Sequence, residues 1–136
     1  MRTILRILER AGGYRPTLYL KIENPPYMAL VIEATPDPGP LKAPAISVAH
    51  YGEQNGDLMR DPEMCFELTN PLGMGWTMTA YYFRNDYMGV EQFSRTRDGK
   101  NYIFYPDLLH QHEQFARMWD RNLRAQGFFE AFERSR

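Results

Sequence analysis

The residues with the most potential for chemistry cluster in a short polar segment between two strand-like stretches. They are a histidine and four carboxylates: His50, Glu53, Asp57, Asp61 and Glu63. Imidazole and carboxylate groups are ligands for magnesium, manganese or zinc, and a histidine beside a carboxylate can act as a general acid or base. A small metal-assisted hydrolase or nuclease centred on His50 is therefore one hypothesis. The spacing matches no named ligand motif, however, and a solvated turn explains the same residues.

Other catalytic signatures are weak or missing in this sequence. The single cysteine, Cys65, stands between Met64 and Phe66, which favours a buried structural thiol over a nucleophile. The sequence contains no phosphate-binding loop, no Gly-x-Ser-x-Gly and no dinucleotide fingerprint. His110 and His112 fall within a predicted amphipathic helix. We therefore assign no catalytic residue, and we expect neither a cofactor nor a metal.

A second candidate surface combines aromatic and cationic side chains on neighbouring predicted strands. Bases stack on such aromatics while guanidinium groups contact phosphates, and Tyr and Arg are also enriched in protein–protein interfaces. We expect a protein partner, with single-stranded nucleic acid or a second copy of the chain as alternatives. The proposed binding residues are Tyr82, Arg84, Tyr87, Phe93, Arg95 and Arg97.

The composition fits one globular domain spanning residues 1–136. Hydrophobic residues make up 43% of the chain and aromatic residues 14%, enough for a packed core. Sixteen basic and seventeen acidic residues give a formal net charge of −1. This balance argues against a protein held to nucleic acid mainly by phosphate neutralisation.

The number of cysteines and the hydropathy of the sequence indicate the cellular compartment of the protein. A single cysteine cannot form an internal disulfide, which excludes a disulfide-stapled secreted scaffold. The N-terminal residues are too evenly charged for a signal peptide, and no apolar run approaches the roughly 18 residues that a membrane helix needs. We therefore expect a cytoplasmic protein, of bacterial type, that does not insert into a membrane.

The elements that position the polar segment form a predicted β-hairpin. Ile46 and Val48 share the alternation of His50, so all three are expected on one face. Asn55-Gly56 between two alternating runs is a strong signal for a two-residue hairpin turn. Pro62 lacks a backbone N–H, so regular pairing is expected to resume only after it.

The rest of the chain alternates between predicted strands and helices. A short N-terminal helix is expected over residues 4–10, with Thr3 as its cap, and a long helix from Pro106 to Gly127 precedes a short aromatic one. A proline-rich loop covers 35–44 and a break falls at 70–75. The pattern predicts an α+β fold: an antiparallel meander of about five to seven strands with the helices on one face. Further strands are expected over 14–24, 27–34, 76–83, 88–95 and 102–105.

Three segments, 20–28, 46–58 and 119–123, resemble a family of bacterial domains of unknown function. The segments read Leu-Lys-Ile-Glu-Asn-Pro-Pro-Tyr-Met, Ile-Ser-Val-Ala-His-Tyr-Gly-Glu-Gln-Asn-Gly-Asp-Leu and Trp-Asp-Arg-Asn-Leu. The family is found on plasmids, phages and integrative elements. The resemblance spans nearly the whole chain and implies a small accessory protein of a mobile element, but it assigns no catalytic or binding residue.

Overall fold

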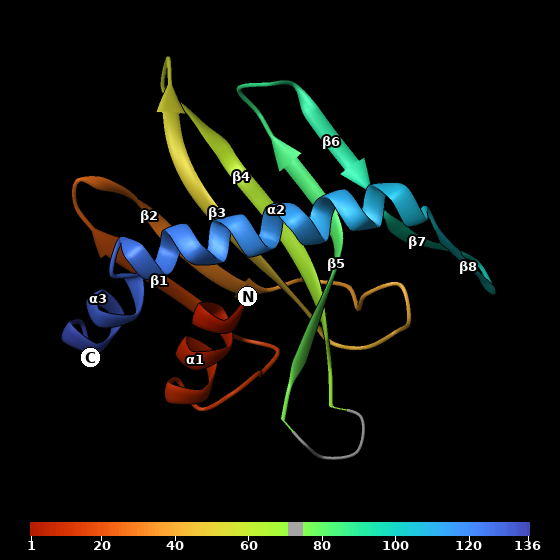
Figure 1. The fold of residues 1–136 in the computed structure, drawn as a ribbon, viewed down its shortest axis with the longest axis horizontal. Helices are drawn as coiled ribbons and strands as arrows, with labels where there is room; N and C mark the ends of the chain where they lie inside the picture. Colours follow the sequence, from red (N-terminus) through yellow and green to blue (C-terminus); the bar gives the residue numbers. More distant parts are fainter. Residues whose placement is uncertain (71–74) are drawn as a thin grey trace.

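A six-stranded antiparallel sheet organises the computed structural model, which describes residues 1–70 and 75–136. The strands lie in the order β1-β2-β3-β4-β5-β6, so each strand pairs with its neighbour in the sequence (Figure 1). The predicted α+β meander is confirmed. The strands are β1 (Tyr19–Asn24), β2 (Tyr27–Ala34), β3 (Ala45–Gln54), β4 (Asp57–Thr69), β5 (Thr77–Asn85) and β6 (Val90–Phe93).

The β3–β4 hairpin closes through the predicted two-residue turn. Gln54 pairs with Asp57, while Asn55 and Gly56 adopt positive φ angles of 52° and 86°, as a type I′ turn requires. Pro62 does not delay the pairing, contrary to expectation. Strand β4 pairs on both sides of it, and the register shifts opposite His50, so the proline is accommodated in a bulge.

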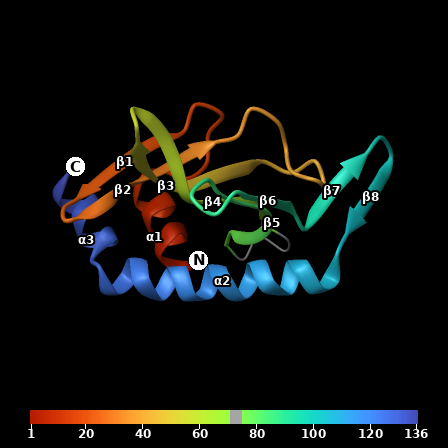
Figure 2. The same ribbon diagram turned by 90° about the horizontal axis from the view of Figure 1, so that it is seen from above.

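Two strand boundaries differ from the prediction because of local hydrogen bonds. Strand β1 begins only at Tyr19, because the Leu18 amide donates to the Arg15 carbonyl in a turn. The predicted strand over 88–95 is interrupted at Ser94, whose buried amide donates to the Tyr81 carbonyl. The chain then forms a separate hairpin of β7 (Arg95–Asp98) and β8 (Asn101–Phe104), which projects from the β6 end of the sheet (Figures 1 and 2).

All three helices lie on one side of the sheet (Figure 2). They are α1 (Arg2–Arg10), α2 (Pro106–Ala125) and α3 (Phe128–Arg134), so the predicted placement of the helices is confirmed. Their apolar faces and the facing strand residues form one core, whose burial supplies the main driving force for folding. Its largest fully buried members include Ile4, Ile7, Ile22, Leu30, Ile32, Ile46, Met64, Phe66, Leu68, Leu123 and Phe128.

The N-terminal helix is held by the other helices rather than by its own cap. Thr3 was expected to cap it, but the helix begins at Arg2 and Thr3 is buried within its first turn. The Thr3 amide donates to Asp120 Oδ1 of α2 at 2.9 Å, and the Arg10 guanidinium pairs with Glu133 of α3 at 2.7 Å. Helix α1 therefore depends on tertiary contacts. The predicted break at 70–75 lies mostly outside the described residues.

Candidate binding face

His50 belongs to the core side of the sheet. Its ring lies between the rings of Trp119 and Phe128, each with its centroid 5.5 Å away, and Nδ1 donates to the Ala29 carbonyl at 3.2 Å. Burial lowers the pKa of His50 below its usual value of 6.5. These contacts describe a neutral, packed histidine that helps to join the helices to the sheet.

The four carboxylates predicted beside His50 do not gather around it. Glu53 and Asp57 are exposed at the hairpin tip, and Asp61 accepts a hydrogen bond from Asn85 Nδ2 at 2.9 Å. Glu63 is paired with Ala49, which alternates with His50, and its carboxylate accepts from the Ser47 hydroxyl at 2.5 Å. Glu63 therefore faces the other side of the sheet.

The metal-assisted hydrolase hypothesis needed His50 and at least two of these carboxylates at ligand distance. Across residues 1–70 and 75–136, no three His, Cys, Asp or Glu side chains are grouped so that they could hold a metal ion. Cys65 is buried, and this burial raises its pKa to about 12, so the thiol stays protonated. The described residues therefore form no metal or catalytic centre around His50.

The opposite side of the sheet, called here the helix-free face, carries the side chains that alternate with the core residues. Strand register places side chains from all six strands on it. The proline-rich loop 35–44 covers part of one end of this face, where the Leu41 and Ala43 amides donate to Glu67 and Arg97 donates to the Pro40 carbonyl. The face includes Tyr19, Lys21, Ala29, Val31, Glu33, Ser47, Ala49, Tyr51, Glu53, Leu58, Arg60, Glu63, Cys65, Tyr82, Arg84, Glu91 and Phe93.

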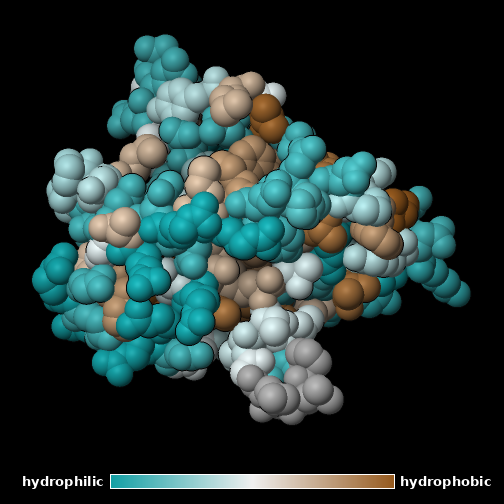
Figure 3. Space-filling view, in the orientation of Figure 1, coloured by the Kyte–Doolittle hydropathy of each residue, from teal (hydrophilic) through white to brown (hydrophobic). Residues whose placement is uncertain are grey.

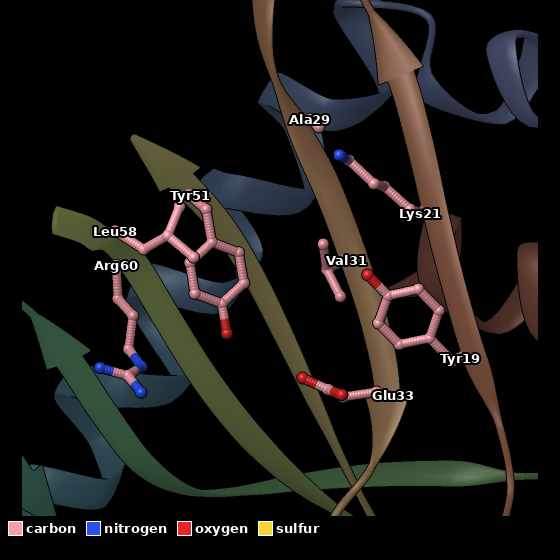
Figure 4. Close-up of a pocket in the computed structure, with 8 residues that line it drawn as sticks. All are labelled: Tyr19, Lys21, Ala29, Val31, Glu33, Tyr51, Leu58 and Arg60. Carbon is pink, nitrogen blue, oxygen red and sulfur yellow. The ribbon is translucent and has the colours of Figure 1, made fainter. Parts of the chain in front are cut away.

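A first hollow of about 420 Å³ lies on this face over strands β1 to β4 (Figure 4). Its floor consists of Ala29 and Val31 of β2, and Leu58, 71% exposed, stands at its rim. Partial burial raises the pKa of Tyr51, so its hydroxyl remains protonated and can both donate and accept. The full lining is Tyr19, Lys21, Ala29, Val31, Glu33, Tyr51, Leu58 and Arg60.

A second hollow of about 560 Å³ lies toward the β6 side, between the proline-rich loop and the β7–β8 hairpin. Phe93, 50% exposed, lines it, and its ring packs on Tyr82 with 4.8 Å between centroids. Arg97 also lines it but donates to the Pro40 carbonyl at 2.7 Å. Hollows of several hundred Å³ are the size in which proteins bind small groups and side chains.

The guanidinium groups of Arg60, at the edge of the first hollow, and of Arg84, on β5, are already paired with carboxylates. Arg60 lies 3.2 Å from Glu63 and 3.5 Å from Asp86. Arg84 lies 2.7 Å from Asp86 and 3.7 Å from Glu91. The backbone amide of Arg60, with the Arg84 side chain, holds the pKa of the Asp86 carboxyl below its usual value. The centre of the face is therefore a network of ion pairs between arginine and carboxylate side chains.

Arg95, predicted to contact a partner, is instead 2% exposed and points inward. Its guanidinium pairs with the fully buried Glu67 at 2.5 Å, and its Nε donates to the Tyr102 hydroxyl at 2.8 Å. Among the other predicted binding residues, Tyr82 is buried with its hydroxyl donating to Glu91, while Tyr87 is exposed and packs against Gly52 at the hairpin. Of the predicted binding residues, some are therefore exposed on the surface and others are buried.

The family model for a domain of unknown function, DUF6908, matches residues 2–129. The chain belongs to the DUF6908 family. No curated protein and no solved structure matches it. Within the described residues of this DUF6908 chain, no helix is both long and apolar enough to cross a membrane.

Sequence reasoning missed most residues of the first hollow in this DUF6908 chain. The sequence shows Tyr19 and Lys21 alternating with apolar residues, whereas the strand that contains Glu33 is apolar on both faces. A single sequence does not show which residues of β1 and β2 lie side by side. A signal was present in Leu58, a large apolar residue directly after the turn, where solvent exposure disfavours it.

Proposed function

We propose that this DUF6908 chain is a binding module that holds a partner protein on its helix-free face. The observation that carries the proposal is the asymmetry of the sheet. Helices α1, α2 and α3 cover one side only (Figure 2), and the surface on that side is mainly hydrophilic (Figure 3). On the other side, Tyr19, Leu58 and Phe93 are 57%, 71% and 50% exposed beside the two hollows. Exposed apolar side chains rimmed by polar ones are typical of interaction surfaces.

The charges of the face favour a protein over single-stranded nucleic acid. Phosphate binding needs guanidinium groups that are free to contact the backbone, yet Arg60 and Arg84 are paired with carboxylates. Glu33, Glu63 and Glu91 add negative charge to the same face, and the net charge of the chain is −1. A protein surface of mixed charge complements this pattern better than a polyanion.

The sequence resemblance supplies the biological context of the proposal. It supports a small cytoplasmic accessory protein encoded on a bacterial plasmid, phage or integrative element. In that setting the partner is another protein of the element or of its host. The predicted activity is binding, and the proposal includes no reaction.

The proposal is tested by capturing partners from nuclease-treated native lysate with the full chain. Leu58→Asp and Phe93→Asp place a charge on the helix-free face, and Met118→Asp places one on α2, where Met118 is 41% exposed. We expect each of the two face variants to capture at least about tenfold less partner than the wild type, because buried apolar anchors dominate interface energies. The control variant is expected to keep it.

Three outcomes would contradict the proposal. One is equal capture by all variants, and another is loss of capture in Met118→Asp alone. The third is capture that occurs only from lysate left without nuclease, together with retention of the chain on single-stranded DNA, which would indicate nucleic acid. Light scattering of the purified chain separates self-association from partner binding, because a dimer abolished by Leu58→Asp would assign the face to a second copy.

A further inference from the structure

Glu33 is the one charged residue lining the first hollow that makes neither an ion pair nor a side-chain hydrogen bond within the part of the chain that the structure describes. The two cations of the same hollow are both engaged. Lys21 Nζ lies 3.3 Å from Glu23, and Arg60 pairs with Glu63 and Asp86. Glu33 is also half-buried, so its carboxylate is partly withdrawn from water. The hollow therefore holds one negative charge without a matching partner.

Tyrosines stand on both sides of this carboxylate. Tyr19 and Glu33 are direct cross-strand neighbours of β1 and β2, and Tyr51 comes from β3. Figure 4 shows the Glu33 carboxylate lying between the two rings, with the Tyr51 hydroxyl directed toward it and the Tyr19 hydroxyl directed into the hollow. One carboxylate, two hydroxyl groups and two aromatic rings thus surround one position above the apolar floor.

From this arrangement we infer that the first hollow receives an arginine side chain of the partner protein, with its guanidinium group beside Glu33 between Tyr19 and Tyr51. A guanidinium group is planar, stacks on aromatic rings and presents several N–H donors to carboxylate and hydroxyl oxygens. The aliphatic part of the same side chain suits the floor of Ala29 and Val31. This inference rests on the proposed function, because it names what the partner inserts.

Arginine fits the hollow better than the other cationic side chain. Lysine offers a compact ammonium group that is more strongly hydrated and stacks less well on tyrosine. A neutral side chain would leave the Glu33 carboxylate without a counter-charge when the face is covered, which is costly for a desolvated carboxylate. The charge and shape of the site therefore select for guanidinium.

The test is an NMR titration of the isotope-labelled full chain with N-acetyl-arginine N-methylamide. We expect weak, saturable binding in the millimolar range, with chemical-shift changes confined to the backbone around Tyr19, Glu33 and Tyr51. The citrulline analogue, which is neutral and nearly the same shape, is expected to bind at least about fivefold more weakly, as is the lysine analogue. Added salt should weaken the arginine analogue more than the citrulline one.

Two variants locate the site. Glu33→Gln removes the charge while keeping the shape, and we expect it to weaken binding of the arginine analogue about fivefold. Glu53→Gln, at the exposed hairpin tip, is the matched control and should leave binding unchanged. Equal binding of the arginine and citrulline analogues, tighter binding of lysine, or full binding by Glu33→Gln would each overturn the inference.

The same set of variants keeps this inference separate from the proposed function. If the arginine analogue does not bind while Leu58→Asp still abolishes partner capture, the arginine site is wrong and the binding face stands. If Leu58→Asp and Phe93→Asp leave capture unchanged, the proposed function itself falls. If Glu33→Gln loses partner capture and Glu53→Gln keeps it, the result supports both the binding face and the arginine site.

Discussion

At the scale of single residues, burial controls the titration of His50 and His112. Burial lowers the pKa of each below its usual value of 6.5. The unfolded chain therefore takes up protons near that value while the folded chain resists them, so the free energy of unfolding should fall as the pH drops below about 6.5. We expect both imidazole resonances to titrate below that of an ordinary histidine in NMR spectra.

The surroundings of His112 on α2 show why its ring resists protonation. His112 is enclosed, with Nδ1 2.8 Å from the Ser94 hydroxyl and Nε2 3.1 Å from Gln92 Oε1. Titration of His50 or His112 at or above the usual value would contradict the packing described for them.

The buried Glu67–Arg95 pair predicts a large and specific loss of stability. Arg95→Met leaves the Glu67 carboxylate buried with the amides of Leu41 and Ala43 as its remaining donors among residues 1–70 and 75–136. Removing one member of a buried pair typically costs about 3–5 kcal/mol, because the remaining charge is uncompensated. Urea unfolding should show this loss for Arg95→Met and at most about 1.5 kcal/mol for Arg97→Met, which breaks only the bond to Pro40. Similar losses of stability for Arg95→Met and Arg97→Met would contradict the buried pairing of Arg95 with Glu67.

The contrast between Arg95 and Arg97 shows where sequence reasoning stops at this scale. Both arginines were predicted to bind a partner, because each lies among the aromatic residues of neighbouring predicted strands. The break at Ser94 changes their surroundings, and Glu67, 28 positions away, becomes the partner of Arg95. The local pattern could not reveal that pairing. It did predict that Cys65 would be buried, because the flanking apolar residues alone indicate it.

At the scale of elements, the β3–β4 hairpin depends on the conformation of its two turn residues. Gly56 has a φ of 86°, which an L-residue with a side chain adopts only with strain. We expect Gly56→Ala to lower the free energy of unfolding by about 1 kcal/mol, while Asn55→Gly, which suits the same turn, changes it little. The measurement is urea unfolding of both variants, and equal stability of Gly56→Ala and wild type would contradict the turn type.

Helix α1 is attached through Asp120, and this contact predicts a second effect on stability. Asp120→Ala removes the acceptor for the Thr3 amide and should cost about 1 kcal/mol, the usual value for losing a helix cap. Asp120→Asn retains an acceptor oxygen and should retain most of that stability. Hydrogen exchange of the α1 amides would show the local loss, and unchanged protection in Asp120→Ala would contradict the attachment.

Element types were more predictable than their ends. The helical period of α2 and the Asn55-Gly56 turn were strong local signals, and the structure confirms both. The late start of β1 and the split at Ser94 are set by hydrogen bonds to Arg15 and Tyr81. The backbone geometry that forms these bonds leaves no periodic trace in the sequence.

At the scale of the whole molecule, one face of the sheet builds the core with all three helices, and the other is the helix-free face. Strand alternation predicted two faces, and the helices were expected on one of them. The register that brings Tyr19, Glu33 and Tyr51 near one another could be read only from the structure. The first hollow was therefore beyond sequence reasoning, while the general aromatic and arginine character of the second was not.

The most direct test of the helix-free face as the binding surface is site-specific photo-crosslinking in native cells. A benzophenone side chain is placed at Leu58 or Phe93 on the helix-free face, or at Met118 on α2, all of which are exposed. The account predicts that Leu58 and Phe93 crosslink to the same protein and that Met118 does not. Crosslinking of that protein from Met118, without crosslinks from Leu58 and Phe93, would contradict it.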